Sequence, residues 1–364
     1  MNLLRIGEIW KILRTNQRLT QQMRRRLMRK SDVLIKYNEV DATKAIGRMM
    51  ESFTWTDYAS GSADTVSLSL NNMNNLWVKK GYIPLHTDRL KAWIRVTDWN
   101  CAGDTRSVFC GQFQVDKYTD GGPPDVFVLE GICIPINRSF NVTARNKTYK
   151  KTSVKRRMAD IAKKAGMKLV YDAADYTIKE IAQGGKTDME FAFSICEDYG
   201  LAMKIYNRKL VIYDMSKYEK RKAGYTIDLS GLGESGAYSI EKNVSSMYDG
   251  VKMQYTGKGK KTVTYKYVRP GKKGNRLLFI SSSADSHGDA ERKAKAQLLK
   301  SLREVQVITL FNLRGDPKYK AAECFELTGA GQLNGKYFVD QVTHSKDGRY
   351  TCSITAHLVA TQIG

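Results

Sequence analysis

The chain lacks the cysteine spacing that marks a zinc knuckle. Its six cysteines are Cys101, Cys110, Cys133, Cys196, Cys324 and Cys352, and no two have C-x-x-C spacing, which argues against cysteine-bound zinc. Cys133, Cys196 and Cys352 fall on apolar strand or helix faces, where a thiol behaves as a small hydrophobe. We therefore expect reduced core cysteines in a protein made in a cytoplasm. A disulfide between Cys101 and Cys110, which flank a short loop, stays open as the alternative.

Signatures of membrane segments and of enzymes are also missing. No stretch of about 18 apolar residues is present, and the N-terminus does not read as a secretion signal. The chain contains no H-E-x-x-H, no G-x-S-x-G and no P-loop. Its Gly-rich segment at 229–236, "LSGLGESG", precedes a predicted strand and not a helix, so it has no helix N-terminus with which to hold phosphate. Of its four histidines, His86 and His287 suit loop or capping positions. We expect no catalytic residue, no cofactor and no metal site.

Acidic residues are scarce relative to basic ones. The chain has 37 Asp and Glu against 60 Lys and Arg, a net charge of +23, which favours anionic partners such as nucleic acid, a membrane surface or an acidic protein face. The basic runs are scattered, whereas a nucleic-acid reader usually concentrates charge on one element with aromatic residues between. Tyr265 and Tyr267, beside Lys266 and Arg269, are the best local candidate for such a surface. A solvated strand face is the simpler interpretation.

The first thirty residues predict a basic amphipathic helix. Apolar residues, Trp10 among them, repeat at helical spacing, and Arg24, Arg25 and Arg26 crowd its C-terminal end, where cations suit the helix dipole. We interpret 1–30 as an extension that docks on its own protein or on a neighbouring subunit. The alternative is a helix that lies on a membrane or on nucleic acid.

Residues 31–140 predict a first antiparallel β-barrel or sandwich. In "SFTWTDYASGSADTVSLSL", Phe53, Trp55 and Asp57 alternate with threonines, as in a strand with two different faces. "DVLIKYNEVDATKAI" predicts a strand, a turn at Asn38-Glu39 and a second short strand. Six or more such short strands, roughly evenly spaced, favour a barrel or sandwich.

Residues 141–222 predict a small α+β region. A helix capped by Ser153 is stopped by Gly166, and a second begins with the capping box Thr187-x-x-Glu190. A hairpin across Asn207-Arg208 follows.

Residues 223–364 return to strands around a third helix, which Ser286 caps, and predict a second β-barrel domain. They end in "GKYFVDQVTHSKDGRYTCSITAHL", a hairpin that turns at Asp347-Gly348. The predicted fold class is therefore mainly β with an α+β insert: two antiparallel β-barrel domains flank a small helix and hairpin region, and an N-terminal amphipathic helix precedes them.

The C-terminal third carries a family resemblance. "AERKAKAQLLKSL", "LRGDPKYKAAECFELTG" and "LNGKYFVDQVTHSKDGRYTCSITAHL", in this order, resemble the late control protein D family, the hub proteins of contractile phage-tail baseplates. The resemblance covers roughly 31–360 and extends to the base of type VI secretion spike proteins. The matching signature positions are Gly315, Pro317, Gly335, Tyr337, Val339, Val342 and His344.

The resemblance implies a non-enzymatic adapter whose two barrel-like domains are related to the tail-tube subunit. Three copies would form a ring that joins the hexameric tube to a trimeric spike, assembled in a bacterial cytoplasm as part of a phage tail, a tail-like bacteriocin or another injection particle. The chain ends at 364 without a needle domain, so a separate spike protein is expected. Trp10, Arg24, Arg25 and Arg26 would contact a neighbouring baseplate or tape-measure protein. No membrane and no specific nucleic acid is expected.

Two alternatives stay open: a basic nucleic-acid-binding β-barrel protein, and a tail-associated cell-wall hydrolase.

The two histidines of the final hairpin bear on the enzymatic alternative. Simple alternation puts Phe338 and Val342 on the same side as His344, with Tyr337 and Val339 opposite. A strand apolar on both faces is covered on both, so we interpret His344 as a buried hydrogen-bonding residue. His357 falls on the polar face, without an acidic partner nearby in sequence.

Overall fold

The computed structural model describes residues 29–79, 83–135, 139–232, 237–256 and 262–363. The predicted N-terminal helix, with Trp10, Arg24, Arg25 and Arg26, lies outside the described residues. Lys30, assigned to that helix, instead opens the first strand. Among the described residues, no helix is long and apolar enough to cross a membrane.

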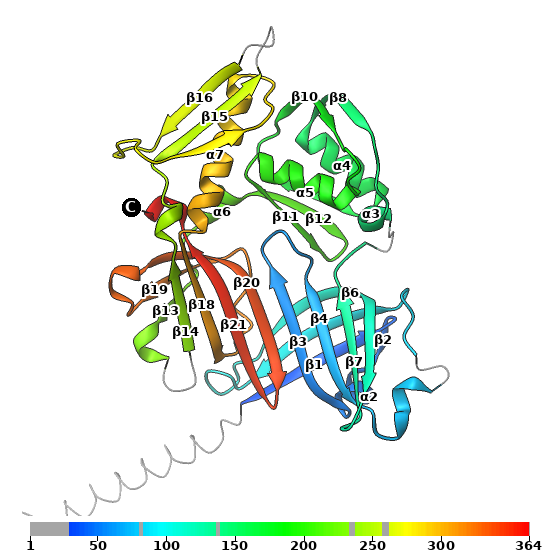
Figure 1. Cartoon of the computed structure of the whole chain (residues 1–364). Coiled ribbons are helices and arrows are strands. Elements are labelled where there is room, and N and C mark those ends of the chain that lie inside the picture. The colour runs from blue at the N-terminus through cyan, green and yellow to red at the C-terminus, as the bar shows by residue number, and fades with distance from the viewer. Residues whose placement is uncertain (1–28, 80–82, 136–138, 233–236, 257–261, 364) are drawn as a thin grey trace, which may run out of the picture.

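Most of the molecule is built on one large sheet (Figure 1). Its thirteen described strands fall into two groups along the chain. The first β lobe contains β1 (Lys30–Tyr37), β2 (Val40–Asp41), β3 (Met50–Tyr58), β4 (Thr65–Asn71), β5 (Arg89–Thr97), β6 (Arg106–Gly121) and β7 (Val126–Ile132). The second β lobe contains β13 (Tyr225–Asp228), β14 (Ala237–Lys242), β18 (Gln306–Arg314), β19 (Cys324–Thr328), β20 (Gly335–Asp347) and β21 (Arg349–Leu358).

The two lobes are joined by backbone pairing. Strand β20 runs antiparallel to β3, from the pair Gln341 and Tyr58 to the pair Asp347 and Ser52. The sheet order is β14-β18-β21-β20-β3-β4-β7-β6-β5-β1-β2; β19 also pairs with β20, and β13 pairs with β19. The mainly β fold class is confirmed, and the sheet is continuous from one lobe to the other. The division of the chain at 140 and 222 stays a prediction.

The turn at Asn38-Glu39 and the second short strand predicted after it are confirmed, since β2 pairs with β1, but the strand is shorter than the quoted segment. The second short strand expected after the Asn38-Glu39 turn covers only β2, and Thr43–Gly47 forms helix α2. The carboxylate of Asp41 accepts a hydrogen bond from the Thr43 N–H at 2.9 Å, a local turn that favours helix over strand. Ile46 is buried on the inner side of this helix.

The α+β character of the middle region is confirmed. It contains α3 (Ser139–Val142), β8 (Thr148–Ser153), α4 (Val154–Lys164), β9 (Lys168–Asp172), β10 (Thr177–Ala182), α5 (Asp188–Asp198), β11 (Leu201–Tyr206), β12 (Lys209–Asp214) and α6 (Met215–Glu219). Ser153 accepts a hydrogen bond from the Arg156 N–H, as an N-cap does. Thr187 and Glu190 form both halves of the predicted capping box. Asn207 and Arg208 form the β11–β12 turn, with φ of 46° and 58°.

The strands between the two parts of the second lobe do not join its sheet. β15 (Gly250–Thr256), β16 (Thr262–Val268) and β17 (Leu277–Ser281) form a separate three-stranded sheet. Its inner face packs on α7 (His287–Arg303), through Met253 on the sheet and Ala290 and Ala294 on the helix, all three fully buried. This unit lies beside the middle region, on the same side of the large sheet (Figure 1). The second lobe therefore has fewer strands than the sequence predicted.

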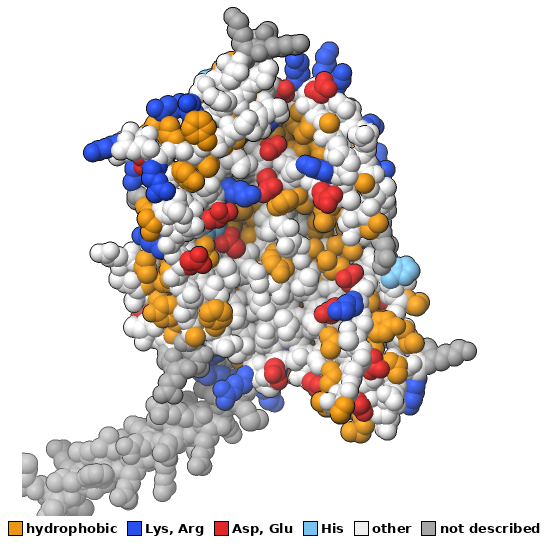
Figure 2. Space-filling view, viewed as in Figure 1, with side chains coloured by type: hydrophobic (Ala, Val, Ile, Leu, Met, Phe, Trp, Pro, Cys, Tyr) orange, Lys and Arg blue, Asp and Glu red, His pale blue; other side chains and the backbone are white. Residues whose placement is uncertain are grey.

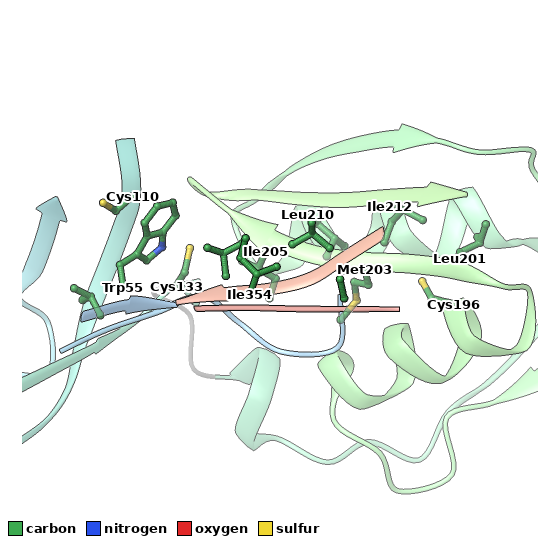
Figure 3. Packing of buried hydrophobic residues seen from close by; sticks show 14 of the residues in the cluster. Trp55, Cys110, Cys133, Cys196, Leu201, Met203, Ile205, Leu210, Ile212 and Ile354 are labelled. Carbon is green, nitrogen blue, oxygen red and sulfur yellow. The ribbon is translucent and has the colours of Figure 1, made fainter. Parts of the chain in front are cut away.

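The core runs through the lobes and the middle region without a gap. Figure 3 shows Trp55 and Cys110 of the first lobe, Ile205 and Leu210 of the middle region and Ile354 of the second lobe within one packed cluster. The predicted core cysteines Cys133, Cys196 and Cys352 are all buried. Cys101 is exposed and Cys110 is buried, and both are free thiols. Short 3-10 segments complete the described chain at Met73–Val78, Leu229–Gly231, Val244–Ser246, Gly331–Leu333 and Ala360–Gln362.

Candidate functional site at the junction of the two lobes

The signature positions lie on the strands that join the lobes. A β-bulge interrupts the β20–β21 pairing between Val339 and Gln341, which shifts the alternation of faces by one residue. Tyr337, Val339, Val342 and His344 consequently pair with Leu358, Ala356, Ile354 and Cys352, which share one face of β21. The predicted split, with Tyr337 and Val339 opposite His344, is therefore wrong. Phe338 points the other way, where its ring lies 5.3 Å from that of His357.

His344 is a structural hydrogen-bonding residue, as the sequence predicted. Its ring stacks on Trp55 of β3, with centroids 4.6 Å apart. Nδ1 accepts from the Tyr350 hydroxyl at 2.7 Å, and Nε2–H donates to the Tyr319 carbonyl at 3.1 Å. Burial lowers the pKa of His344 to about 4. The ring is therefore neutral at physiological pH, and it aligns strands from both lobes.

The signature turn Gly315-Asp316-Pro317 also connects the lobes. The Gly315 carbonyl accepts from the Trp99 indole N–H at 2.7 Å, and Asp316 accepts from Arg106, also at 2.7 Å. A Cβ at Gly315 would lie 2.5 Å from the Tyr350 ring. Only glycine lets this turn approach that ring so closely. This close approach is a physical reason for glycine at position 315 of the signature.

Gly335 and Tyr337 hold the start of β20. A Cβ at Gly335 would lie 2.8 Å from Leu358, and its φ of +153° is one that other residues rarely adopt. The Tyr337 hydroxyl donates to the Leu333 carbonyl at 2.8 Å and accepts from Gln306. Both residues act in packing.

His357, predicted on the polar face without an acidic partner nearby in sequence, is buried and has two acidic partners from more distant parts of the chain. Its Nδ1–H donates to Asp340 at 2.8 Å, and its Nε2–H donates to Glu219 of α6 at 3.0 Å. Burial opposes the charged ring, but these carboxylates raise the pKa of His357 to about 9. Arg303 of α7 also donates to Glu219. A buried cation thus ties β21 to helices outside the sheet.

A second buried charge cluster involves Lys204, which sequence reasoning did not single out. Lys204 of β11 donates to Asp57 and, at 2.9 Å, to Asp64. The second Asp57 oxygen accepts from the Ala321 N–H at 2.9 Å, so first lobe, middle region and second lobe meet here. Burial raises the pKa of Asp64 to about 7. One sequence feature could have predicted this cluster. Asp57 lies on the same face of a predicted strand as Phe53 and Trp55, and a buried carboxylate needs a charged or hydrogen-bonding partner.

The candidate nucleic-acid surface is not an exposed aromatic platform. Tyr265 is buried toward α7, with its ring 5.4 Å from that of His287, and the Lys295 ammonium lies over the Tyr267 ring. Lys266 alone of this group is on the exposed side of β16. Figure 2 shows Lys and Arg side chains spread over the visible face among acidic and apolar ones. Stacking of bases on these tyrosines would require the helix to move away.

The ionisable groups at the junction make contacts between the elements that meet there. Among the described residues, no group of His, Cys, Asp and Glu is arranged to hold a metal ion. Burial raises the pKa of the Cys352 thiol, 3.2 Å from His344, to about 12, so this pair is no nucleophile and base. His344, His357 and Lys204 bond to groups on other elements, which positions strands and helices, while Trp55 Nε1 and Asp64 Oδ2 have no hydrogen-bond partner among the described residues.

Solved structures share this arrangement over nearly the whole chain. A 43 kDa tail protein of prophage MuSo2 from Shewanella oneidensis superposes with a TM-score of 0.66 at 12% identity, covering 91% of this chain and 99% of that one. A tail protein from Neisseria meningitidis superposes with a TM-score of 0.66 at 13% identity, covering 92% and 99%. The chain has the fold of these tail proteins.

The fold extends to secretion machinery. An E. coli type VI secretion component, described as similar to the T4 bacteriophage tail proteins gp27 and gp5, superposes with a TM-score of 0.53 at 11% identity, covering 92% of this chain and 75% of that one. No protein-family model matches the sequence, and the search of curated proteins found no match. The predicted likeness to tail hubs is thus confirmed as a likeness of fold.

Proposed function

We propose that the chain is a structural, non-enzymatic hub of a contractile phage-tail baseplate or of a related injection particle. The observation that carries this proposal is the fold shared with two tail proteins across 99% of their length. In the proposed assembly, three copies form a ring that connects a hexameric tail tube to a trimeric spike. The particle would be assembled in the bacterial cytoplasm.

The large sheet supports a ring assembly, because one of its edges is open. Within the described chain, β14 pairs only with β18, so one row of its backbone N–H and C=O groups is available to another strand. Tyr238 on β14 and Phe311 on β18 are 51% and 41% exposed beside this edge. A head-to-tail contact that uses this edge closes into a ring when its rotation permits.

The same proposal gives a role to each part of the chain. The two lobes would each occupy one position of a pseudo-sixfold ring below the tube. The signature residues would act by holding β20 and β21 in place, and Trp10, Arg24, Arg25 and Arg26 would contact another baseplate or tape-measure protein. The domain limits 1–30, 31–140, 141–222 and 223–364 would separate the extension, the two barrels and the insert.

Light scattering after size-exclusion chromatography tests the ring. We expect a particle of three times the 41.2 kDa chain mass, alone or with the spike protein added. The double variant Tyr238→Asp, Phe311→Asp should be monomeric. Phe279→Asp is the matched control, because Phe279 is also exposed, on the separate small sheet, and this variant should keep the trimer. A strictly monomeric wild-type chain with salt-sensitive DNA affinity would instead favour the nucleic-acid alternative, and clearing of cell walls in a zymogram would favour the hydrolase.

A further inference from the structure

A basic hollow lies between the first β lobe and the middle region. Its volume is about 340 Å³, within the range of ligand pockets. Residues from three parts of the chain line it: strands β5 and β6 with the segment after β7, the end of helix α4, and the β11–β12 turn. The charged residues at its wall are Arg89, Lys163, Lys164 and Arg208.

Three of these cations lack a direct ion pair among the described residues. Arg89, Lys163 and Arg208 form no ion pair with any described residue. No Asp or Glu lines the hollow; Glu39, which interacts with Arg89 through its charge, pairs directly with Lys91 at 2.7 Å, and Asp188 pairs with Lys164, also at 2.7 Å. Like charges that converge without a counter-ion repel one another. An anionic ligand in the hollow would relieve that repulsion.

Gln114 adds an unmet hydrogen bond to the same wall. Its side chain is buried, at 5% exposure, and its Nε2 donates to the His86 carbonyl. Its Oε1 is enclosed and has no hydrogen-bond partner among the described residues. Buried amide oxygens are normally paired, so a ligand that brings an N–H donor to this position would satisfy it.

We propose that the hollow binds an acidic polypeptide segment of a partner protein. Such a segment supplies carboxylates for Arg89, Lys163 and Arg208 and backbone N–H groups for the Oε1 of Gln114. The apolar part of the wall, which includes Phe113 and Met167, contacts the aliphatic stems of its side chains. Inorganic phosphate matches the cations but offers nothing to the apolar wall. The site does not depend on the hub assembly proposed above.

Fluorescence anisotropy of the full chain with a labelled seven-residue glutamate peptide tests the site. Wild type should bind it, and the double variant Arg89→Gln, Arg208→Gln should bind about tenfold more weakly or worse, because two charge-assisted contacts are lost. The matched control is Lys222→Gln, Lys266→Gln, which removes the same charge from exposed positions elsewhere. The control should bind within about twofold of wild type.

A second variant separates this site from general charge attraction. Gln114→Leu keeps every cation and should weaken the glutamate peptide severalfold, while any weak binding of inorganic phosphate stays unchanged. Circular dichroism of each variant verifies folding. Equal peptide affinities in the Arg89, Arg208 variant and in its control would overturn the proposal. A larger loss for a DNA duplex than for the peptide would also overturn it, because the hollow would then serve nucleic acid.

Discussion

The Lys204 ammonium lies 2.9 Å from Asp64 Oδ1, inside the protein where the first lobe, the middle region and the second lobe meet. The Lys204 side chain is 15% exposed and that of Asp64 is 1% exposed. Asp64 has almost no access to solvent, and Lys204 has little, so water cannot fully replace either partner. The position of the middle region on the sheet therefore depends on this buried pair and on Asp57, which also bonds to Lys204.

Lys204→Met tests this dependence. The variant leaves Asp57 and Asp64 buried without a cation, and it should lower the free energy of unfolding by about 3–5 kcal/mol. Urea denaturation measures the change. Lys266→Met is the control, since replacing an exposed lysine should change the free energy of unfolding by less than about 0.5 kcal/mol. Adding Asp64→Asn to Lys204→Met should restore part of the loss; no recovery would contradict an electrostatic cause.

His357 should make stability depend on pH in the alkaline range. Its pKa is raised from 6.5 to about 9 in the folded protein, so protonated His357 contributes stability that is full below pH 6.5 and is lost as pH rises through 9. Between pH 6.5 and pH 9, the free energy of unfolding of the wild type should therefore fall by roughly 3 kcal/mol more than that of His357→Gln. Urea unfolding of both proteins at several pH values gives the difference. A difference that does not change with pH would show that the ring is neutral.

His344 should act in the opposite direction. Burial lowers its pKa from 6.5 to about 4, so the neutral ring contributes stability that is present above pH 6.5 and is lost as pH falls toward 4. His344→Phe should flatten the stability profile over this acidic interval, measured as above. His86→Gln, at an exposed position, should keep the wild-type profile. If His344→Phe keeps the same acid sensitivity, another group causes it.

Gly315→Ala should destabilise the junction of the lobes. The added Cβ would lie 2.5 Å from the Tyr350 ring, and overpacking of this kind costs about 1–3 kcal/mol. Thermal unfolding followed by circular dichroism measures it. Gly288→Ala is the control, because its added Cβ would meet no atom within 4 Å outside its own helix and its chain neighbours and alanine favours the helix that contains it. A Gly315→Ala protein as stable as this control would show that the turn can shift.

Local signals predicted the helices and turns well. Ser153, Thr187 and Ser286 each accept a hydrogen bond from a backbone N–H three residues later. The turns at Asn207-Arg208 and Asp347-Gly348 lie where the sequence places them. These features depend on contacts within a few residues, so the sequence contains all the information they need.

The candidate site could be predicted only in part. The signature strand and its buried His344 were identifiable from the pattern of residues. Which residues share a face of this strand could not be predicted, because the bulge between Val339 and Gln341 shifts the alternation by one residue and the residue pattern does not reveal it. Glu219 and His357 are 138 residues apart, and only the fold brings them together.

The sequence by itself determined the mainly β class, the capped helices, the tight turns and the buried cysteines, since propensity, capping and periodicity are local. Only the tertiary structure decided that β3 and β20 pair, that β15, β16 and β17 form a sheet of their own, and that Lys204 joins Asp57 and Asp64. Strand edges are chemically alike, so the choice of partner strand depends on which distant surfaces bury together. Buried charges likewise acquire partners only when the chain closes around them.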